Sequence, residues 1–474
     1  MCCGKHTTVD ENSLFRSDQM SREIPFRGYF RLRREKEFRA TFSREENMKR
    51  QIRQFFLVRE LLKNQWLKTS QIQDIQQKKL HKLLHHAYTN VPYYRQLFDS
   101  VGVKPGDIQT VSDLSVLPIT TKSTLRELPL NQITAQNIDL KTCIKDRTSG
   151  STGMPLNFFF TRDDMDIRSP VEIRMLASVG YKATDSTLAI IDDRHLGTTY
   201  WFQRLGILRR EYISILSPVE EHIKRIQTMK PDIIWTLTSN IVLIASRMQA
   251  DNIRVTRPKA IYTIGEFLDP NRRRLIASVF GVAPLDQYSS TECGGIAWEC
   301  SARMGYHINI DTVVVECINN GKHVQSGESG ELIVTNLHSY AMPFIRYSVG
   351  DRGILSDKMC SCGRNLPLMM AIEGRSVDFI VLENGKRISP YLLTCAIEDI
   401  PGIVRYQIIQ EAAKQITVNF IKGDGFSPET LRKIQTQCQG VVGKDVEIKP
   451  VVVESLVHDK SGKFRVVISK LATN

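Results

Sequence analysis

Long apolar stretches are absent from this 474-residue sequence. Its longest apolar runs, among them FFLV and AIYTI, are far shorter than the roughly 20 residues needed to cross a bilayer. The opening segment MCCGKHTTVDENS also lacks the apolar core of a secretory signal, so we expect a cytoplasmic protein. Internal repeats and low-complexity tracts are missing as well, and the composition is that of an ordinary globular protein.

Cysteine is scarce, with ten residues in the whole chain. That number is too small for a scaffold held together by disulfides. We therefore expect free thiols, some of which could ligate a metal.

Positive charge is in excess, with a net charge of +13. The first 70 residues hold +7 of it, from 16 Lys and Arg against 9 Asp and Glu. No nucleic-acid-binding motif accompanies this excess, and an anionic substrate such as ATP needs only a modest one, so we expect no nucleic-acid partner. The segment 27–42 could form a basic helix that rests on a membrane surface or a partner. The favoured alternative is a solvated arm or a helix packed on its own domain.

The apolar pattern divides the chain into three parts. Residues 50–100 show helical spacing with a break at Pro92. Between 140 and 350, short β-like runs alternate with helical runs, which is typical of an α/β domain with a mixed or parallel sheet. After Gly374 the pattern becomes that of a small α+β domain. We predict an α/β protein with a basic arm and helical extension (1–70), a large domain (71–374) and a small C-terminal domain (375–474).

The segment RTSGSTGMPLNFFFT contains six consecutive small residues: Thr148, Ser149, Gly150, Ser151, Thr152 and Gly153. It is not a Walker loop, because Met154 stands where that motif has lysine. The residues that follow, LNFFFT, are β-like, so we expect the loop to join strands rather than to open a helix. Backbone amides and hydroxyls in such a loop can still bind phosphate, although the run alone could also be a surface loop.

Four further motifs follow this loop along the chain. In QYSSTECGG, Thr291 could meet a phosphate oxygen while Glu292 holds a hard cation such as Mg²⁺. RYSVGDRG offers Asp351 for ribose hydroxyls, EGRSVDFI offers Arg375, and DKSGKFR offers Lys463 on a glycine loop. Each motif could be a plain turn, but five in this order are hard to attribute to chance.

With the segment that runs from HHAYTNVPYY to STLRE (85–127), these motifs resemble the adenylate-forming superfamily, which activates carboxylates with ATP. They are most similar to the phenylacetate–coenzyme A ligase family, including its capsule-biosynthesis-type members. The likeness runs from about residue 75 to the end. It implies a large adenylation domain, a small mobile C-terminal domain, ATP and Mg²⁺ at the site, and coenzyme A as co-substrate.

The resemblance also implies roles for residues at matching motif positions. The glycine loop would hold the β- and γ-phosphates of ATP. Gly265 and Glu266 in TIGEFL would line the adenine, and Asp286 and Tyr288 would bind and stack on it. The remaining roles are Thr291 and Glu292 at the α-phosphate and Mg²⁺, Asp351 at the ribose, Arg375 at the ribose–phosphate region, and Lys463 at the substrate carboxylate and α-phosphate.

Two positions depart from the superfamily pattern. Many members carry a lysine after the proline of the glycine loop, where this chain has Leu156. The hinge between the domains usually reads Gly-Arg-x-Asp-Asp, and Val377 replaces its first Asp here. The second change puts in doubt how freely the C-terminal domain turns after adenylation.

Three cysteines and one histidine form a candidate zinc set: Cys300, His307, Cys360 and Cys362. Cys₃His is a usual tetrahedral complement for Zn²⁺, although the C-x-C spacing is tighter than common. Buried thiols beside an unrelated histidine are the alternative. Metal-bearing relatives that the chain resembles carry the same four residues, so we expect a structural Zn²⁺.

The favoured interpretation is an ATP-dependent ligase that forms an acyl-adenylate and transfers the acyl group to coenzyme A. The acid is expected to be aromatic or otherwise apolar from the family alone, because the pocket walls, expected around 190–240 and 262–296, are not diagnostic. One alternative keeps adenylation but uses an amine or hydroxyl acceptor. Another is a non-catalytic scaffold or membrane-associated relative. A homodimer is also possible.

Overall fold

The computed structural model describes residues 44–147, 156–191, 201–215, 217–375, 380–385, 387–388, 390–397, 400–458 and 465–471. The chain divides into two compact units, Met1–Arg53 and Gln54–Asn474. The segment 27–42 lies outside the described residues. Among the described helices, none combines the length and the apolar character that a membrane crossing requires.

The first helices confirm the helical spacing read from residues 50–100. They are α2 (Arg44–Asn64), α3 (Thr69–Asn90) and α4 (Pro92–Ser100), followed by the short helices α5 (Lys122–Glu127) and α6 (Leu130–Ile133). Pro92 occupies the first turn of α4, where its missing N–H costs no hydrogen bond. The break predicted at this proline is therefore a helix start. Leu80, Leu84 and Phe98 bury their side chains in a common core under these helices.

A sheet of twelve strands forms the centre of the large domain. In spatial order its strands are β11 (Lys322–His323), β10 (Val313–Asn319), β12 (Ser329–Asn336), β13 (Tyr347–Ser356), β14 (Leu368–Arg375), β9 (Tyr306–Ile308), β8 (Gly294–Glu299), β7 (Leu285–Ser290), β6 (Ala260–Ile264), β5 (Ile233–Leu237), β3 (Thr187–Ile191) and β4 (Arg210–Ser214). The five strands from β7 to β4 are parallel and the others pair antiparallel. The predicted mixed sheet is confirmed.

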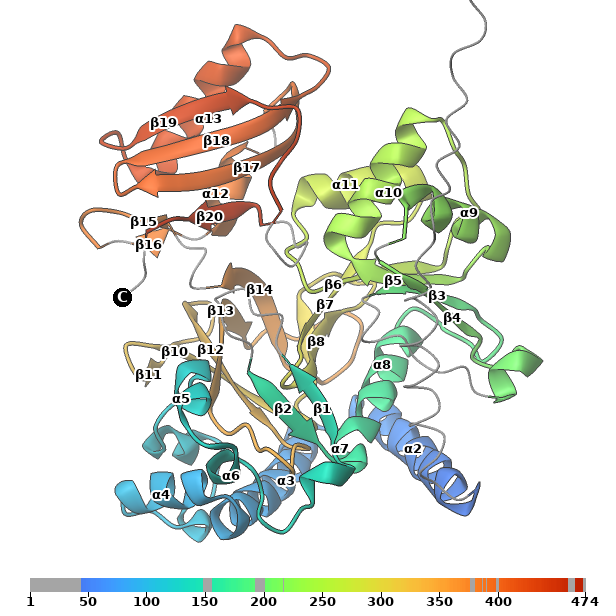
Figure 1. Ribbon diagram of the computed structural model, residues 1–474, viewed down its shortest axis with the longest axis vertical. Helices are drawn as coiled ribbons and strands as arrows, with labels where there is room; N and C mark the ends of the chain where they lie inside the picture. The colour runs from blue at the N-terminus through green and yellow to red at the C-terminus, as the bar shows by residue number, and fades with distance from the viewer. Residues whose placement is uncertain are drawn as a thin grey trace, which may run out of the picture. The chain divides into compact units, whose positions relative to one another are not determined.

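Helices cover both faces of the parallel strands. On one face lie α9 (Val219–Met229), α10 (Thr238–Ala250) and α11 (Pro270–Phe280), as Figure 1 shows, and their apolar residues share a core with Leu188, Ile234 and Ile261. On the other face Met175 and Leu176 of α8 (Arg168–Ala177) pack against Tyr262 and Trp298. Strands buried on both faces read as near-continuous apolar runs, and this is why the sequence identified them.

The glycine-rich segment connects two strands. β1 (Ile144–Arg147) and β2 (Asn157–Phe160) form an antiparallel hairpin in which Arg147 lies opposite Asn157. The segment between them, 148–155, lies outside the described residues. The prediction that this loop joins strands is confirmed by its flanks.

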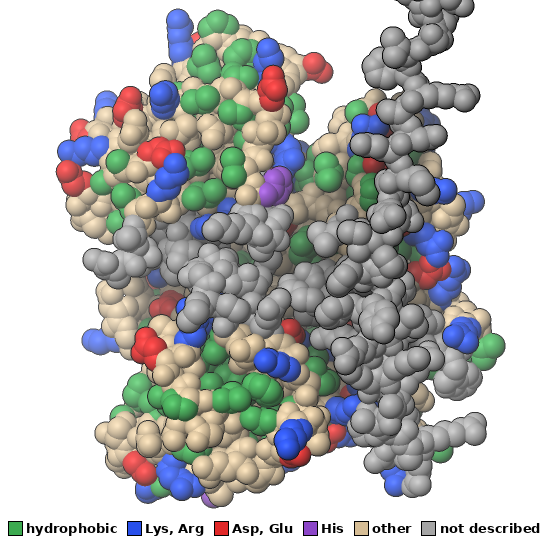
Figure 2. All heavy atoms as spheres, viewed as in Figure 1, with side chains coloured by type: hydrophobic (Ala, Val, Ile, Leu, Met, Phe, Trp, Pro, Cys, Tyr) green, Lys and Arg blue, Asp and Glu red, His purple; other side chains and the backbone are tan. Residues whose placement is uncertain are grey.

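The C-terminal part has its own core, drawn from residues 380–467. Its sheet has the order β19 (Glu447–Val452), β18 (Gln415–Lys422), β17 (Ile403–Ala412), β20 (Val467–Ser469), with helices α12 (Pro390–Ile397) and α13 (Pro428–Val442) and a small pair β15 (Ile380–Val381) and β16 (Arg387–Ile388). A separate core is the mark of a separate domain. The smaller α+β domain is confirmed, and its boundary at residue 375 stays a prediction. In the view of Figure 2, basic and acidic side chains are interspersed on the surface of this C-terminal part.

A fully buried ion pair fixes helix α8 to the sheet. The Arg174 guanidinium donates from Nη1 to both carboxylate oxygens of Asp311 at 2.9 Å, and both side chains are 0% exposed. Arg174 Nη2 also donates to Asn309 Oδ1 at 2.6 Å, and Asn64 Nδ2 donates to Asp311 at 3.0 Å. Burial alone would raise the pKa of Asp311, but Arg174 and the hydrogen bond from Asn64 hold it below its ordinary value.

Replacing Arg174 should leave Asp311 as an unpaired buried charge. We expect Arg174→Met to lower the free energy of unfolding by about 3–5 kcal/mol. The matched control is Arg247→Met, because Arg247 is half exposed and pairs with Asp251 on the surface of α10. That change should cost less than about 1 kcal/mol. Denaturant unfolding measures both, and equal effects of the two substitutions would contradict the assignment.

Candidate active site

The predicted residues at 265–266 and 291–292 follow the carboxyl ends of β6 and β7, where open α/β sheets bind their ligands. Asp286 lies near the opposite end of β7. Ile264, the last residue of β6, lies opposite Gln287 of β7. Gly265 follows at once with φ +71°, and a Cβ there would lie 3.0 Å from the Leu237 side chain. The glycine therefore lets β6 end in a tight turn beside Tyr288.

The Glu266 carboxylate accepts hydrogen bonds from a neighbouring helix of the protein. One of its carboxylate oxygens accepts from the Ser239 amide at 2.6 Å and the other from the Ser239 hydroxyl at 3.0 Å. Thr238 donates its hydroxyl to the Glu266 carbonyl at 3.1 Å. Ser239 lies in the first turn of α10, so Glu266 caps that helix and fixes the segment after β6. Its backbone can still line a base, as predicted.

Asp286 is also engaged by neighbouring side chains. Its two carboxylate oxygens accept from the Thr263 hydroxyl at 2.7 Å and from the Tyr306 hydroxyl at 2.9 Å. Burial and the neighbouring Glu299 carboxylate raise its pKa to about 7. The observed contacts are those of a buried structural carboxyl group, and the predicted contact with adenine stays a prediction.

Tyr288, Asp351 and Arg375 come together from three strands. The Tyr288 hydroxyl donates to Asp351 Oδ2 at 2.7 Å. Asp351 of β13 lies directly opposite Arg375, the last residue of β14. The sequence separates these residues by up to 87 positions, and the hydrogen bond and the pairing of β13 with β14 bring them together. This is the arrangement expected if an aromatic ring and a carboxylate bind a nucleoside.

Glu292 lies in the turn between β7 and β8, and its side chain is mostly buried. Its Oε1 accepts from the Tyr347 hydroxyl at 3.0 Å, and its backbone carbonyl accepts from Asn336 Nδ2 at 3.1 Å. Burial, and then the Glu292 charge, raise the pKa of Tyr347, which therefore stays a neutral donor. No hydrogen bond from the described residues occupies the second carboxylate oxygen, Oε2. An anionic oxygen held in place by two neighbours fits a hard cation such as Mg²⁺.

Several predicted residues cannot be compared with the structure. Thr148, Ser149, Gly150, Ser151, Thr152, Gly153, Val377 and Lys463 lie outside the described residues. Conversely, sequence reasoning missed Tyr347 and Arg168, which both contact the Thr291–Glu292 turn. Tyr347 lies within the motif RYSVGDRG, so its nearness to Asp351 was the available signal. Arg168 lies in no motif, and nothing in the sequence marked it.

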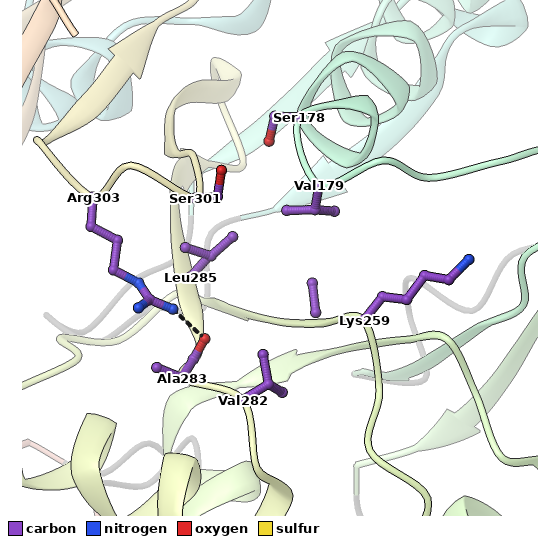
Figure 3. A pocket seen from close by; sticks show the side chains of 9 residues that line it. Ser178, Val179, Lys259, Val282, Ala283, Leu285, Ser301 and Arg303 are labelled. Atoms are coloured by element: carbon purple, nitrogen blue, oxygen red, sulfur yellow. Dashed lines mark hydrogen bonds between the residues drawn. The ribbon is translucent and has the colours of Figure 1, made fainter. Parts of the chain in front are cut away.

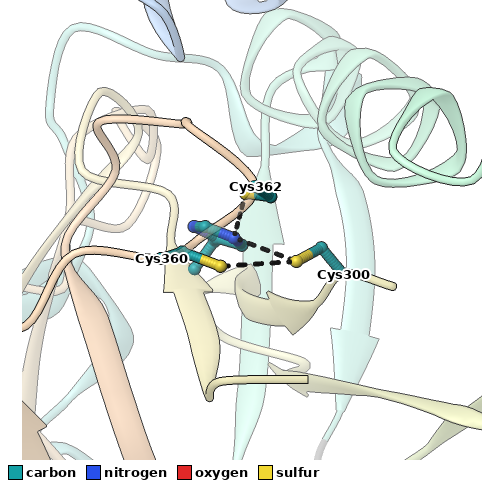
Figure 4. Close-up of side chains that lie close together, drawn as sticks. Cys300, Cys360 and Cys362 are labelled. Atoms are coloured by element: carbon teal, nitrogen blue, oxygen red, sulfur yellow. Dashed lines mark hydrogen bonds between the residues drawn. The ribbon is translucent and has the colours of Figure 1, made fainter. Parts of the chain in front are cut away.

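The four candidate zinc ligands converge. Their ligand atoms all lie within 4.8 Å of one another, although they come from the end of β8, from β9 and from the loop before β14. The Cys300 and Cys360 sulfurs are 3.7 Å apart, and His307 Nε2 lies 3.4 Å from Cys300 Sγ and 3.3 Å from Cys362 Sγ (Figure 4). Tetrahedral zinc with bonds of about 2.3 Å to sulfur places two sulfurs about 3.8 Å apart. The donor set and spacing therefore fit the predicted ion.

A pocket of about 270 Å³ lies at the opposite ends of the parallel strands (Figure 3). Ala260 and Leu285, which line it, are the first residues of β6 and β7. Arg303 at its rim donates to the Ala283 carbonyl at 2.7 Å. Among the predicted site residues, Asp286 lies next to Leu285 at this end, whereas Glu266 and Glu292 follow the other ends of these strands. The pocket is therefore separate from the site around Glu292.

We expect one zinc ion per chain, held as a structural clip. Four protein ligands leave no open position for a reacting water, and joining distant segments should contribute to folding. Elemental analysis of freshly purified, reductant-treated protein should find one equivalent. Cys362→Ser should lose the metal and lower the unfolding temperature, while Cys143→Ser, at a half-buried thiol elsewhere, should do neither. If the wild-type protein contained no zinc, the proposed metal site would be wrong.

Comparison with known proteins adds independent observations. Residues 380–470 match the family described as the CapK C-terminal domain. Phenylacetate-coenzyme A ligase of Aromatoleum evansii is 26% identical over 82% of this chain and 87% of the relative. Protein CapK of Staphylococcus aureus is 22% identical over 84% and 89%. Fumarate--(S)-2,3-diaminopropanoate ligase of Enterobacter agglomerans is 25% identical over 55% and 64%.

A solved structure has the same fold. 2-Hydroxyisobutyryl-CoA ligase, in its postadenylation state with an adenylate, superposes with a TM-score of 0.72 over 86% of this chain and 91% of that chain, at 18% identity. Sequence likeness, matching motif order and this fold agree with one another. The chain is therefore similar over most of its length to phenylacetate–coenzyme A ligases, matches the CapK C-terminal domain over residues 380–470, and shares the fold of 2-hydroxyisobutyryl-CoA ligase.

Proposed function

We propose that this protein is an AMP-forming carboxylic acid–coenzyme A ligase. It couples an acid to ATP, releases pyrophosphate, and passes the acyl group from the adenylate to the thiol of coenzyme A. The observation that carries the proposal is that Tyr288 contacts Asp351, which lies opposite Arg375. Glu292 contacts Tyr347, on the same strand as Asp351. Relatives named as coenzyme A ligases over most of their length support it.

The first half-reaction needs positive charge at one place. Attack of a carboxylate on the α-phosphate brings two anions together, and negative charge builds up on the phosphorus oxygens in the transition state. Fixed cations and hydrogen-bond donors aimed at that charge lower the barrier. Mg²⁺, when bound, supplies part of this stabilisation as a Lewis acid.

Each described residue of the candidate site has a separate role in binding. Glu292, held by Tyr347, offers the anionic oxygen for Mg²⁺. Tyr288 offers an aromatic face for the base, and Asp351 offers carboxylate oxygens for ribose hydroxyls. Arg375 follows at the end of β14, opposite Asp351, in the role expected near the ribose and phosphate.

Two elements of the proposal come from the sequence alone. The hydroxyls and amides of 148–153 would hold the β- and γ-phosphates, and Lys463 would meet the substrate carboxylate and the α-phosphate. Lys463 belongs to the part of the chain that has its own core, so adenylation would require this domain to close over the site. Turning away afterwards, through the segment that contains Val377, would admit coenzyme A.

The relatives do not all name coenzyme A as the acceptor, because one of them is named fumarate--(S)-2,3-diaminopropanoate ligase. An amine or hydroxyl acceptor is therefore the alternative within the same reaction class. A non-catalytic scaffold is the alternative outside it, and the arrangement around Glu292 argues against it. Peripheral membrane contact through the basic arm and a homodimer are further predictions from the sequence.

Pyrophosphate exchange with a panel of acids tests the function directly. Exchange with any acid supports adenylation, and product analysis after adding coenzyme A or candidate amines identifies the acceptor. Incubation with ATP and the small acids of a cell extract, followed by mass spectrometry, would identify the trapped adenylate. If no acid supported pyrophosphate exchange, the ligase proposal would be wrong and the non-catalytic scaffold would be favoured.

Glu292→Gln should weaken Mg²⁺-dependent adenylation by at least tenfold while leaving the unfolding temperature unchanged. The amide keeps an oxygen that can accept from Tyr347, but it lacks the anionic oxygen that a hard cation prefers. Glu221→Gln, an exposed change in the first turn of α9, is the control. Exchange rates measured across a Mg²⁺ titration report the effect. If Glu292→Gln exchanged pyrophosphate as fast as the wild type, Glu292 would not be the Mg²⁺ ligand.

Lys463→Ala should separate the two half-reactions. Loss of its charge should slow adenylate formation by on the order of a hundredfold, as loss of a charge-stabilising group typically does. Attack on the finished adenylate releases AMP and needs this charge less, so the variant should convert a prepared acyl-adenylate at near wild-type speed. Timing each half-reaction separately measures both effects.

The matched control is Lys460→Ala, three positions earlier in the same segment. It should leave both half-reactions unchanged. Equal losses in both half-reactions of Lys463→Ala would mean that the lysine serves both steps or only the fold, and the closing-domain mechanism would have to be abandoned.

A further inference from the structure

Arg168 lies at the start of α8 and contacts the turn that carries Glu292. Its Nη2 donates to the Thr291 carbonyl at 2.8 Å, and its guanidinium carbon lies 4.9 Å from the centre of the Phe160 ring. Gly294, at φ +70° in the same turn, lies so close that a Cβ would come within 3.7 Å of the Arg168 side chain. The arginine thus packs between the turn and the end of β2.

The charges around Arg168 are acidic and come from three elements. Asp146 of β1, Asp164 of α7 (Arg162–Asp166) and Glu292 all interact with it electrostatically. Burial lowers the pKa of Arg168, and these carboxylates act in the opposite direction. An arginine nevertheless stays charged at neutral pH. Arg168 is therefore a fixed cation between the hairpin that flanks the glycine loop and the turn that holds Glu292.

The glycine loop itself brings no cation at the position where many superfamily members have lysine. Leu156 occupies it, is 5% exposed, and packs in an apolar core with Phe158, Phe160 and Phe344. A lysine there would have to leave this core. Arg168 lies over Phe160, which pairs with Ile144 at the end of the hairpin away from the glycine loop.

We propose that Arg168 is a positioning residue for the Mg²⁺ and α-phosphate site, an inference that rests on the proposed function. It holds the Thr291 carbonyl from one side while Asn336 holds the adjacent Glu292 carbonyl from the other. Fixing both carbonyls of this turn sets the direction of the Thr291 hydroxyl and the Glu292 carboxylate. The hairpin and the turn are thereby kept in register for one bound nucleotide.

The geometry favours arginine over lysine. A planar guanidinium can stack on the Phe160 ring while one of its N–H groups donates in the plane. An ammonium group offers a point charge with no flat face. Arg168→Lys should therefore restore part of the function, and Arg168→Met should keep the packing but lose both the charge and the donor.

The experiment measures Mg²⁺ dependence in two independent ways on the full chain. One is the rise in unfolding temperature caused by ATP across a Mg²⁺ titration, which needs no turnover. The other is pyrophosphate exchange with an acid that the wild type accepts. For Arg168→Met we expect a half-saturating Mg²⁺ concentration raised tenfold or more in both measurements, with an unfolding temperature near wild type without ligand. Arg168→Lys should fall between, and Arg247→Met, the exposed arginine on α10, should match wild type.

An unchanged Mg²⁺ requirement in Arg168→Met would overturn the proposal, whatever happened to the unfolding temperature. If that variant does not fold, a wild-type Mg²⁺ requirement in Arg168→Lys overturns it equally. The two proposals can fail separately. Wild-type protein that is stabilised by MgATP but shows no exchange would refute the ligase function, while a raised Mg²⁺ requirement in Arg168→Met would still support Arg168. Absence of MgATP stabilisation in wild type would overturn both.

Discussion

The buried pair of Arg174 and Asp311 is the contact on which the position of α8 depends. Removing two charges from water is costly, and the cost is partly offset here because Asn64 donates a hydrogen bond to Asp311 and Arg174 donates one to Asn309. Such a pair has one good geometry, so it fixes the rotation of the helix as well as its distance from the sheet. Six residues earlier on the same helix, Arg168 reaches the Thr291 carbonyl. The position of the active-site turn is thus tied to an ion pair in the core.

The local elements of the fold were within reach of the sequence, and the long-range ones were not. The predicted alternation of strands and helices between residues 140 and 350 is confirmed by β3, β5, β6 and β7 and by helices α8–α11. Each of these elements has an apolar period of its own that the sequence shows. The short β9 could not be predicted in this way, since three residues carry no period and its pairing with β8 and β14 decides its state.

In the candidate site, too, local features could be predicted from the sequence and long-range contacts could not. Glu292, Asp351 and Arg375 could be named in advance because each lies in a short motif with a recognisable resemblance. Their partners could not, since Tyr347 meets Glu292 across 55 positions and Arg168 meets Thr291 across 123. For Asp286 the motif predicts a ligand contact, and the structure adds that its two carboxylate oxygens accept hydrogen bonds from Thr263 and Tyr306. Motifs identify reactive groups, and packing decides what those groups are free to do.

The four candidate zinc ligands are connected to the candidate site through strands. Cys300 directly follows β8, whose other end begins at Gly294 in the active-site turn, and six strand residues span roughly 20 Å. Cys362 precedes β14, which ends at Arg375 beside Asp351. An ion that joins Cys300, His307 and Cys362 therefore fixes β8, β9 and β14 relative to one another at one end. At the other ends of β8 and β14, the same registers set the distance between Glu292 and Arg375. A cluster too far away to touch a substrate can in this way set the width of the site that binds it.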